Sequence, residues 1–244
     1  MNKLLTGMVF GDLHSPWQDN LMVRLARKVI DDIKPKQIVL VGDQLNFAAY
    51  SSHGARKNEV PGENVKKDFK ECEKTLDTLF DGVKAELVWM DGNHDAWQDD
   101  YFTEYPAFYD EAIHRYNKLK LAKRGFKRII PFKGVFKSGK LHFTHGWRAG
   151  VNAVRTHLVN DYKASFVMGH IHKSDTATSS NIQGNIIQGY SVGCMSKLNF
   201  RYAAQPTSNH GFGIYYVLPN GNFSFHNIVA INRSFIYQGQ LYTP

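Results

Sequence analysis

Short apolar runs alternate with stretches of helical periodicity in the first part of the chain. An apolar run at residues 4–10 ends at Gly11, and the stretch 18–33 then repeats apolar residues at fourfold spacing, at Leu21, Leu25, Val29 and Ile33. Fourfold spacing places side chains on one face of a helix. Pro35 ends this helix, and a second apolar run follows at residues 37–41. The pattern predicts a strand, a helix and a parallel strand.

The alternation continues once more and then gives way to shorter pieces. A polar loop at 46–62 precedes a predicted helix at 64–80 and a third strand at 87–90, and the stretch 101–116 is predicted to be partly helical. Residues 118–128 are basic and are expected to cross the surface. Short β-like runs follow, at 129–130, 134–136, 141–144, 166–168, 213–218 and 223–228. Asn220-Gly221 predicts a hairpin turn between the last two, because both residues accept a positive φ.

Strand–helix units followed by hairpins predict an α/β fold. We expect a four-layer α/β/β/α sandwich, in which two mixed sheets pack together and helices flank them. No internal repeat or low-complexity linker interrupts the chain, so we expect one domain over residues 1–244.

Polar clusters follow five of the predicted strands. They are Asp12-Leu13-His14, Gly42-Asp43, Gly92-Asn93-His94-Asp95, His145-Gly146 and Gly169-His170-Ile171-His172. Carboxylate and imidazole together suit ions such as Mn, Fe, Ni or Zn, and a carboxylate can bridge two of them. Taken singly, an Asp here is more often a helix N-cap, and a His is more often a hydrogen-bonded core residue. The five clusters in this order favour a metal site.

The same clusters resemble the calcineurin-like metallophosphoesterase superfamily. Its signature runs Asp-x-His, Gly-Asp-x-x-(Asp/Asn), Gly-Asn-His-(Asp/Glu), His and Gly-His-x-His, and the match extends from Asp12 to His172. The resemblance implies two divalent ions, of which Mn is the first expectation and Fe, Ni or Zn are alternatives. It implies that one ion is held by Asp12, His14, Asp43 and His172, and the other by Asp43, Asn93, His145 and His170.

The resemblance also assigns roles next to the metals. His94 is expected to act near the leaving-group oxygen, with Asp95 as its orienting or acidifying partner. Asn46 stands where many members carry Asp, and it is a candidate substrate-binding residue together with His53 and Arg148. The arginine that protein phosphatases of this superfamily carry after the second motif is absent, and the Gly-His-Ile-His ending resembles the phosphodiesterase and nuclease branches.

Composition adds a preference among substrates. Lys and Arg exceed Asp and Glu by 30 to 22, a net charge of +8, which favours polyanionic partners. The chain contains only two cysteines, without metal-binding spacing, and no apolar run long enough to span a bilayer. We therefore expect a cytoplasmic protein without a membrane partner, as either a monomer or a homodimer.

The sequence thus predicts a metal-dependent phosphodiesterase that acts on DNA, RNA or a nucleotide. In-line attack by a hydroxide bridging two ions is the expected mechanism. A phosphomonoesterase of broad specificity is the alternative. A non-catalytic scaffold of the same fold is a further alternative, which the presence of all seven expected ligands and His94 disfavours.

Overall fold

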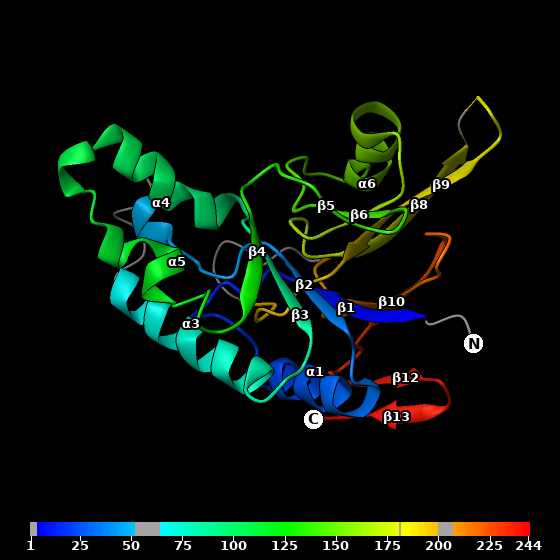
Figure 1. The fold of residues 1–244 in the computed structure, drawn as a ribbon, viewed down its shortest axis with the longest axis horizontal. Coiled ribbons are helices and arrows are strands. Elements are labelled where there is room, and N and C mark those ends of the chain that lie inside the picture. The colour runs from blue at the N-terminus through cyan, green and yellow to red at the C-terminus, as the bar shows by residue number, and fades with distance from the viewer. Residues whose placement is uncertain (1–3, 52–63, 181, 200–206) are drawn as a thin grey trace.

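The computed structural model describes residues 4–51, 64–180, 182–199 and 207–244 (Figure 1). One sheet has the strand order β11-β10-β1-β2-β3-β4 and another the order β5-β6-β7-β9-β8, and β12 and β13 form a separate hairpin. The strands are β1 Leu5–Phe10, β2 Gln37–Val41, β3 Glu86–Met90, β4 Phe126–Ile130, β5 Phe136–Ser138, β6 Leu141–Phe143, β7 Phe166–Met168, β8 Ser174–Ser180, β9 Ile186–Val192, β10 Gly211–Val217, β11 Phe223–Val229, β12 Phe235–Tyr237 and β13 Gln240–Tyr242.

Helices alternate with the early strands and become short later in the chain. The α-helices are α1 Asn20–Ile33, α3 Val65–Phe80, α4 Asn93–Glu104, α5 Arg115–Lys118 and α6 Ala153–Thr156. A π-helical turn, η4, continues α6 over His157–Tyr162. Three 3₁₀ turns complete the described helical elements, at η1 Ala48–Tyr50, η2 Pro106–Phe108 and η3 Glu111–Ile113.

The first sheet is parallel from β1 to β4, and β10 and β11 extend it in antiparallel pairing. Its central strands are apolar over most of their length because both faces are covered. In β2, Leu40 joins the cluster that α1 and α3 cover, while Val39 and Val41 join the cluster between the two sheets. Parallel strands covered on both sides read as continuous apolar runs, which is why the sequence located β1, β2 and β3.

The two long helices begin at side-chain caps. Asp19 accepts hydrogen bonds from the N–H groups of Leu21 and Met22, and Asn64 accepts one from Lys67. These caps satisfy N–H groups that have no partner within the helix. Both helices then pack their apolar faces on one side of the first sheet.

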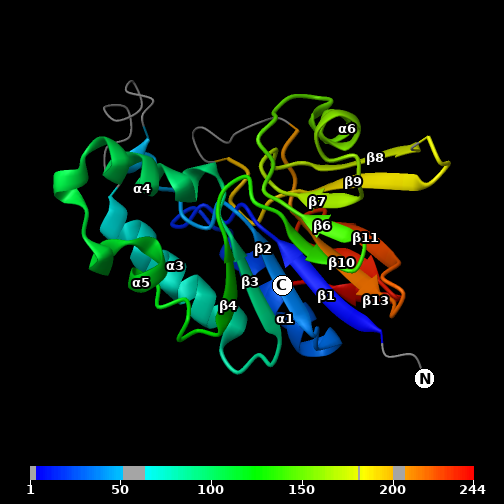
Figure 2. The ribbon, with the colours of Figure 1, turned by 45° about the horizontal axis from the view of Figure 1, so that its top comes forward.

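The second sheet packs on the other side of the first. Phe143 and Val167 face the first sheet across a shared apolar cluster, whereas Phe166 and Met168 pack under α6 and η4. The order of layers is therefore helices, sheet, sheet and helix (Figure 2). The predicted α/β fold of two mixed sheets with flanking helices is confirmed.

Several elements differ from the prediction. Helix α4 begins at Asn93, inside the third motif and before the stretch 101–116 that we predicted to be partly helical. The end of the basic stretch 118–128, which we expected to cross the surface, enters β4, which pairs with β3. The edge strand β8, of sequence Ser-Asp-Thr-Ala-Thr-Ser-Ser, was not predicted. Its polar composition lacks the apolar alternation that marks a half-buried strand.

A helix that spans a bilayer must be about 20 residues long and predominantly apolar. Within the described ranges, no helix is both long and apolar enough to span a membrane.

Candidate metal centre

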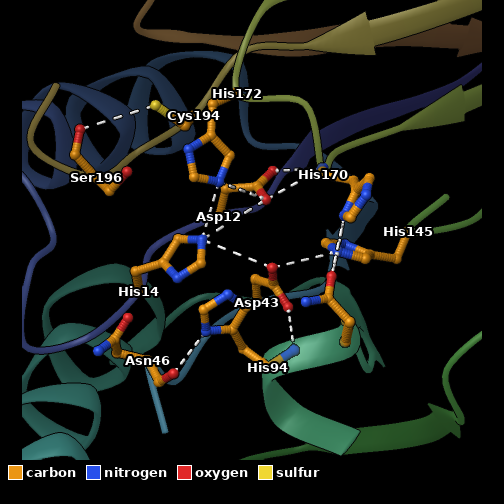
Figure 3. A network of polar contacts seen from close by, with 12 residues as sticks. Asp12, His14, Asp43, Asn46, His94, His145, His170, His172, Cys194 and Ser196 are labelled. Carbon is orange, nitrogen blue, oxygen red and sulfur yellow. Dashed lines mark hydrogen bonds and ion pairs between the residues drawn. The ribbon is translucent and has the colours of Figure 1, made fainter. Parts of the chain in front are cut away.

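The five polar clusters lie directly beyond the carboxyl ends of parallel strands. Three of them follow β1, β2 and β3 of the first sheet, and the other two follow β6 and β7 of the second. Neighbouring parallel strands end at the same edge of a sheet, where ligands usually bind. Because the two sheets pack face to face, these edges bring together the side chains drawn in Figure 3.

One group of donors consists of Asp12, His14 and His172. The Nε2 atoms of His14 and His172 lie 2.9 Å apart, and Nε2 of His172 lies 3.3 Å from Oδ1 of Asp12. Three donor atoms of this group lie within 4.8 Å of one another. A single ion could be held between them.

A second group consists of Asn93, His145 and His170. Oδ1 of Asn93 lies 3.1 Å from Nε2 of His145 and 3.0 Å from Nδ1 of His170. His145 donates its Nδ1–H to the carbonyl oxygen of Val41 at 2.7 Å. That hydrogen bond fixes the tautomer, so Nε2 presents a lone pair to the group.

Asp43 lies between the two groups. Its Oδ2 is 3.6 Å from Nε2 of His14 and 3.3 Å from Nε2 of His145, so the same carboxylate faces both sets of donors. Oδ1 of Asp43 accepts the backbone N–H of His94 at 2.9 Å, which fixes the carboxylate in this orientation. A carboxylate so placed could bridge two ions.

The backbone at the donors adopts a conformation that side chains seldom favour. Positive φ angles between 47° and 70° occur at five of them, Asp12, His14, Asp43, His170 and His172. A non-glycine residue in this region is strained by roughly 1–3 kcal/mol. Such strain clusters at functional sites, where it directs side chains that a relaxed backbone would point elsewhere.

Glycines beside the donors allow them to approach closely. A Cβ atom on Gly92 would lie 2.0 Å from Oδ1 of Asp43, and one on Gly169 would lie 2.4 Å from Oδ2 of Asp12. On Gly42 it would lie 2.3 Å from Nδ1 of His145. The glycines in the motifs are therefore required by packing at the centre.

Burial makes this cluster of charges costly without a compensating cation. Asp12, His14, Asp43 and His145 are all at most 2% exposed. Burial together with His94 lowers the pKa of His14, and burial together with His145 lowers the pKa of His170 to about 4. Neutral imidazoles have lone pairs for metal coordination. Buried carboxylates are paired or bind metals, so the donor set fits divalent ions.

Asp43 and His145 perturb each other. Burial opposes the charge of each, but His145 and His94 hold the pKa of Asp43 well below its usual value. Against the same burial, Asp43 raises the pKa of His145 to about 9. A proton on His145 and a divalent ion would therefore compete for the same place beside Asp43.

His94 lies at the margin of the donor set. Its Nδ1–H donates to the carbonyl oxygen of Asn46 at 2.6 Å, and its ring lies 3.9 Å from that of Trp97, measured between centroids. Figure 3 shows the imidazole between Asn46 and Asp43. Trp97 was not among the residues predicted to lie at the site. It follows His94 by about one helical turn, so a predicted start of α4 at Asn93 would have placed the two side chains on the same face of the helix.

Asp95 forms no hydrogen bond with His94, although the resemblance implied that it orients or acidifies this residue. Its buried carboxylate accepts the backbone N–H groups of Gly92, Leu45 and Gln44 at 2.9, 3.1 and 3.3 Å. The carbonyl oxygen of Asn46 is the partner of His94 instead. Because Asp95 occupies the third position of α4, it caps the helix and joins it to the loop after Asp43.

The three residues that we expected to bind substrate lie in different surroundings from one another. Asn46 is fully buried and contributes its carbonyl oxygen to His94. Arg148 forms a two-point ion pair with Asp161, at 2.7 and 2.9 Å. His53 lies outside the described residues.

His157 supports the loop that follows His145. It donates Nδ1–H to Asp161 at 2.7 Å, and its Nε2 accepts the backbone N–H groups of Trp147 and Arg148 at 3.3 and 3.2 Å. His157 therefore has a structural role outside the motifs.

Comparison with known protein families shows which family has this arrangement of motifs. The model of the calcineurin-like phosphoesterases matches residues 6–174, a span that contains all five clusters. The chain belongs to the calcineurin-like phosphoesterase family. As a member, it is a metal-dependent phosphoesterase, a hydrolase of phosphoester bonds.

Individual relatives are distant. The chain is 22% identical over 182 residues to the gene 54 protein of Mycobacterium phage L5, covering 68% of each chain. It is 23% identical over 186 residues to the gene 54 protein of Mycobacterium phage D29, again covering 68% of each.

Among solved structures, similar folds occur in vacuolar protein sorting 29. The protein from Cryptosporidium parvum has a TM-score of 0.47 and 12% identity, covering 98% of this chain and 95% of that one. The Chaetomium thermophilum protein has a TM-score of 0.41 and 12% identity, covering 98% and 97%. The likeness concerns the fold alone.

Proposed function

We propose that the chain is a phosphodiesterase that cleaves nucleic acid or a nucleotide at a centre of two divalent ions. The observation that carries the proposal is the position of Asp43 between two donor groups, with Oδ2 3.6 Å from His14 and 3.3 Å from His145. Asp12, His14 and His172 would hold one ion and Asn93, His145 and His170 the other, with Asp43 shared. Mn is the first choice, with Fe, Ni or Zn as alternatives.

The ions would supply positive charge for the phosphoryl oxygens and lower the pKa of a water nucleophile. The chain's own contribution begins with orientation. His145 is fixed by Val41 and Asp43 by the N–H of His94, so both donors are held before substrate binds. Preorganised donors need little rearrangement during the reaction.

His94 would protonate the leaving oxygen. Since Nδ1–H is committed to Asn46, the proton available for transfer is the one on Nε2. Burial lowers the pKa of His94, against the opposing effect of Asp43. A lower pKa makes the imidazolium a stronger acid, which assists departure of a poorly stabilised alkoxide.

Two features favour a nucleic-acid or nucleotide substrate over a phosphoprotein. The net charge of +8 attracts polyanions, and the motif ending Gly-His-Ile-His resembles that of nucleases and phosphodiesterases. The arginine that protein phosphatases carry after the second motif is replaced by Phe47, which is buried in the core.

The experiment compares bis-p-nitrophenyl phosphate with p-nitrophenyl phosphate in the presence of Mn. We expect the diester to have the higher kcat/KM. A clear preference for the monoester would instead establish the alternative, a phosphomonoesterase of broad specificity.

Labelled DNA and RNA test the natural substrate class. We expect cleavage of at least one of them with Mn, and loss of that cleavage in His94→Ala. A His94→Ala variant as active as the parent would remove the proposed role of His94. Absence of bound metal after Mn supplementation would favour a non-catalytic scaffold.

A further inference from the structure

Trp17 lies next to the metal centre, and the ammonium groups of two lysines lie near its ring. Its backbone N–H donates to the carbonyl oxygen of His14 at 2.6 Å, so it follows that ligand by one tight turn. The indole is partly exposed. The ammonium nitrogens of Lys67 and Lys197 lie 5.5 and 6.0 Å from the centroid of the ring.

The two lysines reach Trp17 from distant parts of the chain. Lys67 lies in the first turn of α3, where its backbone N–H is bonded to the cap Asn64. Lys197 follows the loop Cys194–Ser196, which Figure 3 shows on the His14 and His172 side of the centre. The backbone N–H of Lys197 donates to the carbonyl oxygen of Trp17 at 2.8 Å. The fold therefore fixes this Trp17 cluster, Trp17 with Lys67 and Lys197, beside one donor group.

The two ammonium groups lie near the same ring and repel each other. The electron-rich face of the indole reduces this cost. Among the residues that the structure describes, neither ammonium group forms an ion pair, and both lysines are exposed. An anion that bound beside the ring would be attracted by both groups, so the cluster is suited to phosphate.

We propose that the Trp17 cluster holds the phosphates of a single nucleic-acid strand next to the phosphodiester that is cleaved. This inference rests on the proposed function and narrows its substrate to a strand longer than one nucleotide. Lysines follow the backbone charge of a strand, and an exposed aromatic ring stacks with unpaired bases. A small diester carries no neighbouring phosphate, so it would not use these contacts.

The test measures binding separately from cleavage. A fluorescein-labelled single-stranded oligothymidylate is titrated with the Mn-loaded protein in a His94→Ala background, and anisotropy gives Kd over a range of salt concentrations. We expect Lys67→Ala/Lys197→Ala to raise Kd about tenfold. The slope of log Kd against log salt should fall by about 1.4, since each phosphate contact on a single strand contributes about 0.7.

A matched control removes the same charge elsewhere. Lys28→Ala/Lys84→Ala alters exposed lysines that line other surface pockets. It should leave Kd within about twofold of the parent and the salt slope unchanged. A loss in this control equal to that in the Lys67 and Lys197 variant would show a general effect of net charge and overturn the proposal.

Hydrolysis of bis-p-nitrophenyl phosphate, measured with His94 intact, supplies the second readout. Lys67→Ala/Lys197→Ala should retain the rate of the parent on this substrate. A parallel loss would mean that the lysines act through the centre, and an unchanged Kd for the strand would mean that they do not bind it. Tighter binding of duplex than of single strand would contradict the assignment to a single strand. If the parent cleaves no phosphodiester, the proposed function is wrong. The binding result then decides only whether the Trp17 cluster binds a single strand.

Discussion

His94 has one ring nitrogen committed to structure and one left for chemistry. The carbonyl oxygen of Asn46 binds Nδ1–H, and the ring of Trp97 lies against the imidazole. Both contacts restrict rotation of the side chain. The residue is therefore positioned to transfer a proton at Nε2 without first reorienting.

We predict that His94→Ala affects substrates according to their leaving group. An alkoxide leaving from a nucleic acid needs a proton, so kcat should fall about 10²–10⁴-fold on an oligonucleotide. p-Nitrophenolate departs readily without one, so kcat on bis-p-nitrophenyl phosphate should fall much less. Steady-state kinetics on both substrates provides the measurement, and an equal loss on both would argue against a role as general acid.

Gly92 packs so closely against the carboxylate of Asp43 that there is no space for a side chain. Its φ is −92°, so an alanine is not strained by the backbone, but the added Cβ would lie 2.0 Å from Oδ1 of Asp43. We predict that Gly92→Ala lowers the affinity for Mn by at least about tenfold, measured by isothermal titration calorimetry. A contact this short requires the carboxylate to move.

Gly82→Ala is the control for that substitution. Gly82 has a φ of +72° and open space around it, so alanine should cost about 1 kcal/mol of stability without changing Mn binding. Equal Mn affinity in Gly92→Ala and the parent would contradict the crowding that the structure shows.

At the scale of elements, the position of the centre follows from the parallel strands. The runs that end at Phe10, Val41 and Met90 are mostly apolar and followed by glycine or a polar residue, which made them recognisable in the sequence. Edge strand β8 is almost entirely polar, and α4 begins within a motif. Strand β8 is held by its pairing with β9, and the start of α4 is held by the hydrogen bonds of Asp95 to the backbone of Gln44 and Leu45. Local sequence reveals neither set of tertiary contacts.

A buried ion-pair network joins α5 to the end of β3, directly before Gly92. Arg115 is 1% exposed, and its guanidinium donates to Asp91 at 2.7 Å and to Asp99 at 2.7 Å. Tyr116 also donates its hydroxyl to Asp91. This network holds the segment that carries Asn93 and His94.

We predict that Arg115→Met lowers the free energy of unfolding by about 3–5 kcal/mol, because it leaves the buried carboxylate of Asp91 without its cationic partner. Arg128→Met removes the exposed pair with Glu86 and should cost less than about 1 kcal/mol. Urea denaturation of both variants makes the comparison. Similar losses would show that the buried network does not stabilise the fold as proposed.

At the scale of the whole molecule, motif order was enough to predict which side chains the fold brings together. All seven expected ligands lie close to one another, because each motif follows a strand whose end reaches the shared edge. The roles of neighbouring residues were less predictable. Asp95 binds three backbone N–H groups and Arg148 pairs with Asp161, and both partners depend on the path of loops that no motif encodes.

Global stability should depend on pH through Asp99. Partial burial acts in the opposite direction, but hydrogen bonds from His114 and Arg115 hold the pKa of Asp99 well below its usual value. A carboxyl whose pKa is lower in the folded state stabilises the fold above the unfolded pKa of about 3.9, and this stabilisation is lost as pH falls.

We therefore predict that the metal-free parent loses more stability than Asp99→Asn between about pH 5 and pH 2, as measured by urea denaturation in EDTA. The neighbouring exposed residue provides the control, since Asp100→Asn should follow the parent. Parallel curves of stability against pH for Asp99→Asn and the parent would contradict a stabilising contribution from Asp99.

The central claim is that Asp43 lies between two metal ions. Its most direct test is an anomalous difference map from crystals grown with MnCl₂. The structure predicts one peak among Asp12, His14 and His172 and a second among Asn93, His145 and His170, about 3.5–4 Å apart. A single peak, or none at these donors, would contradict a two-metal centre.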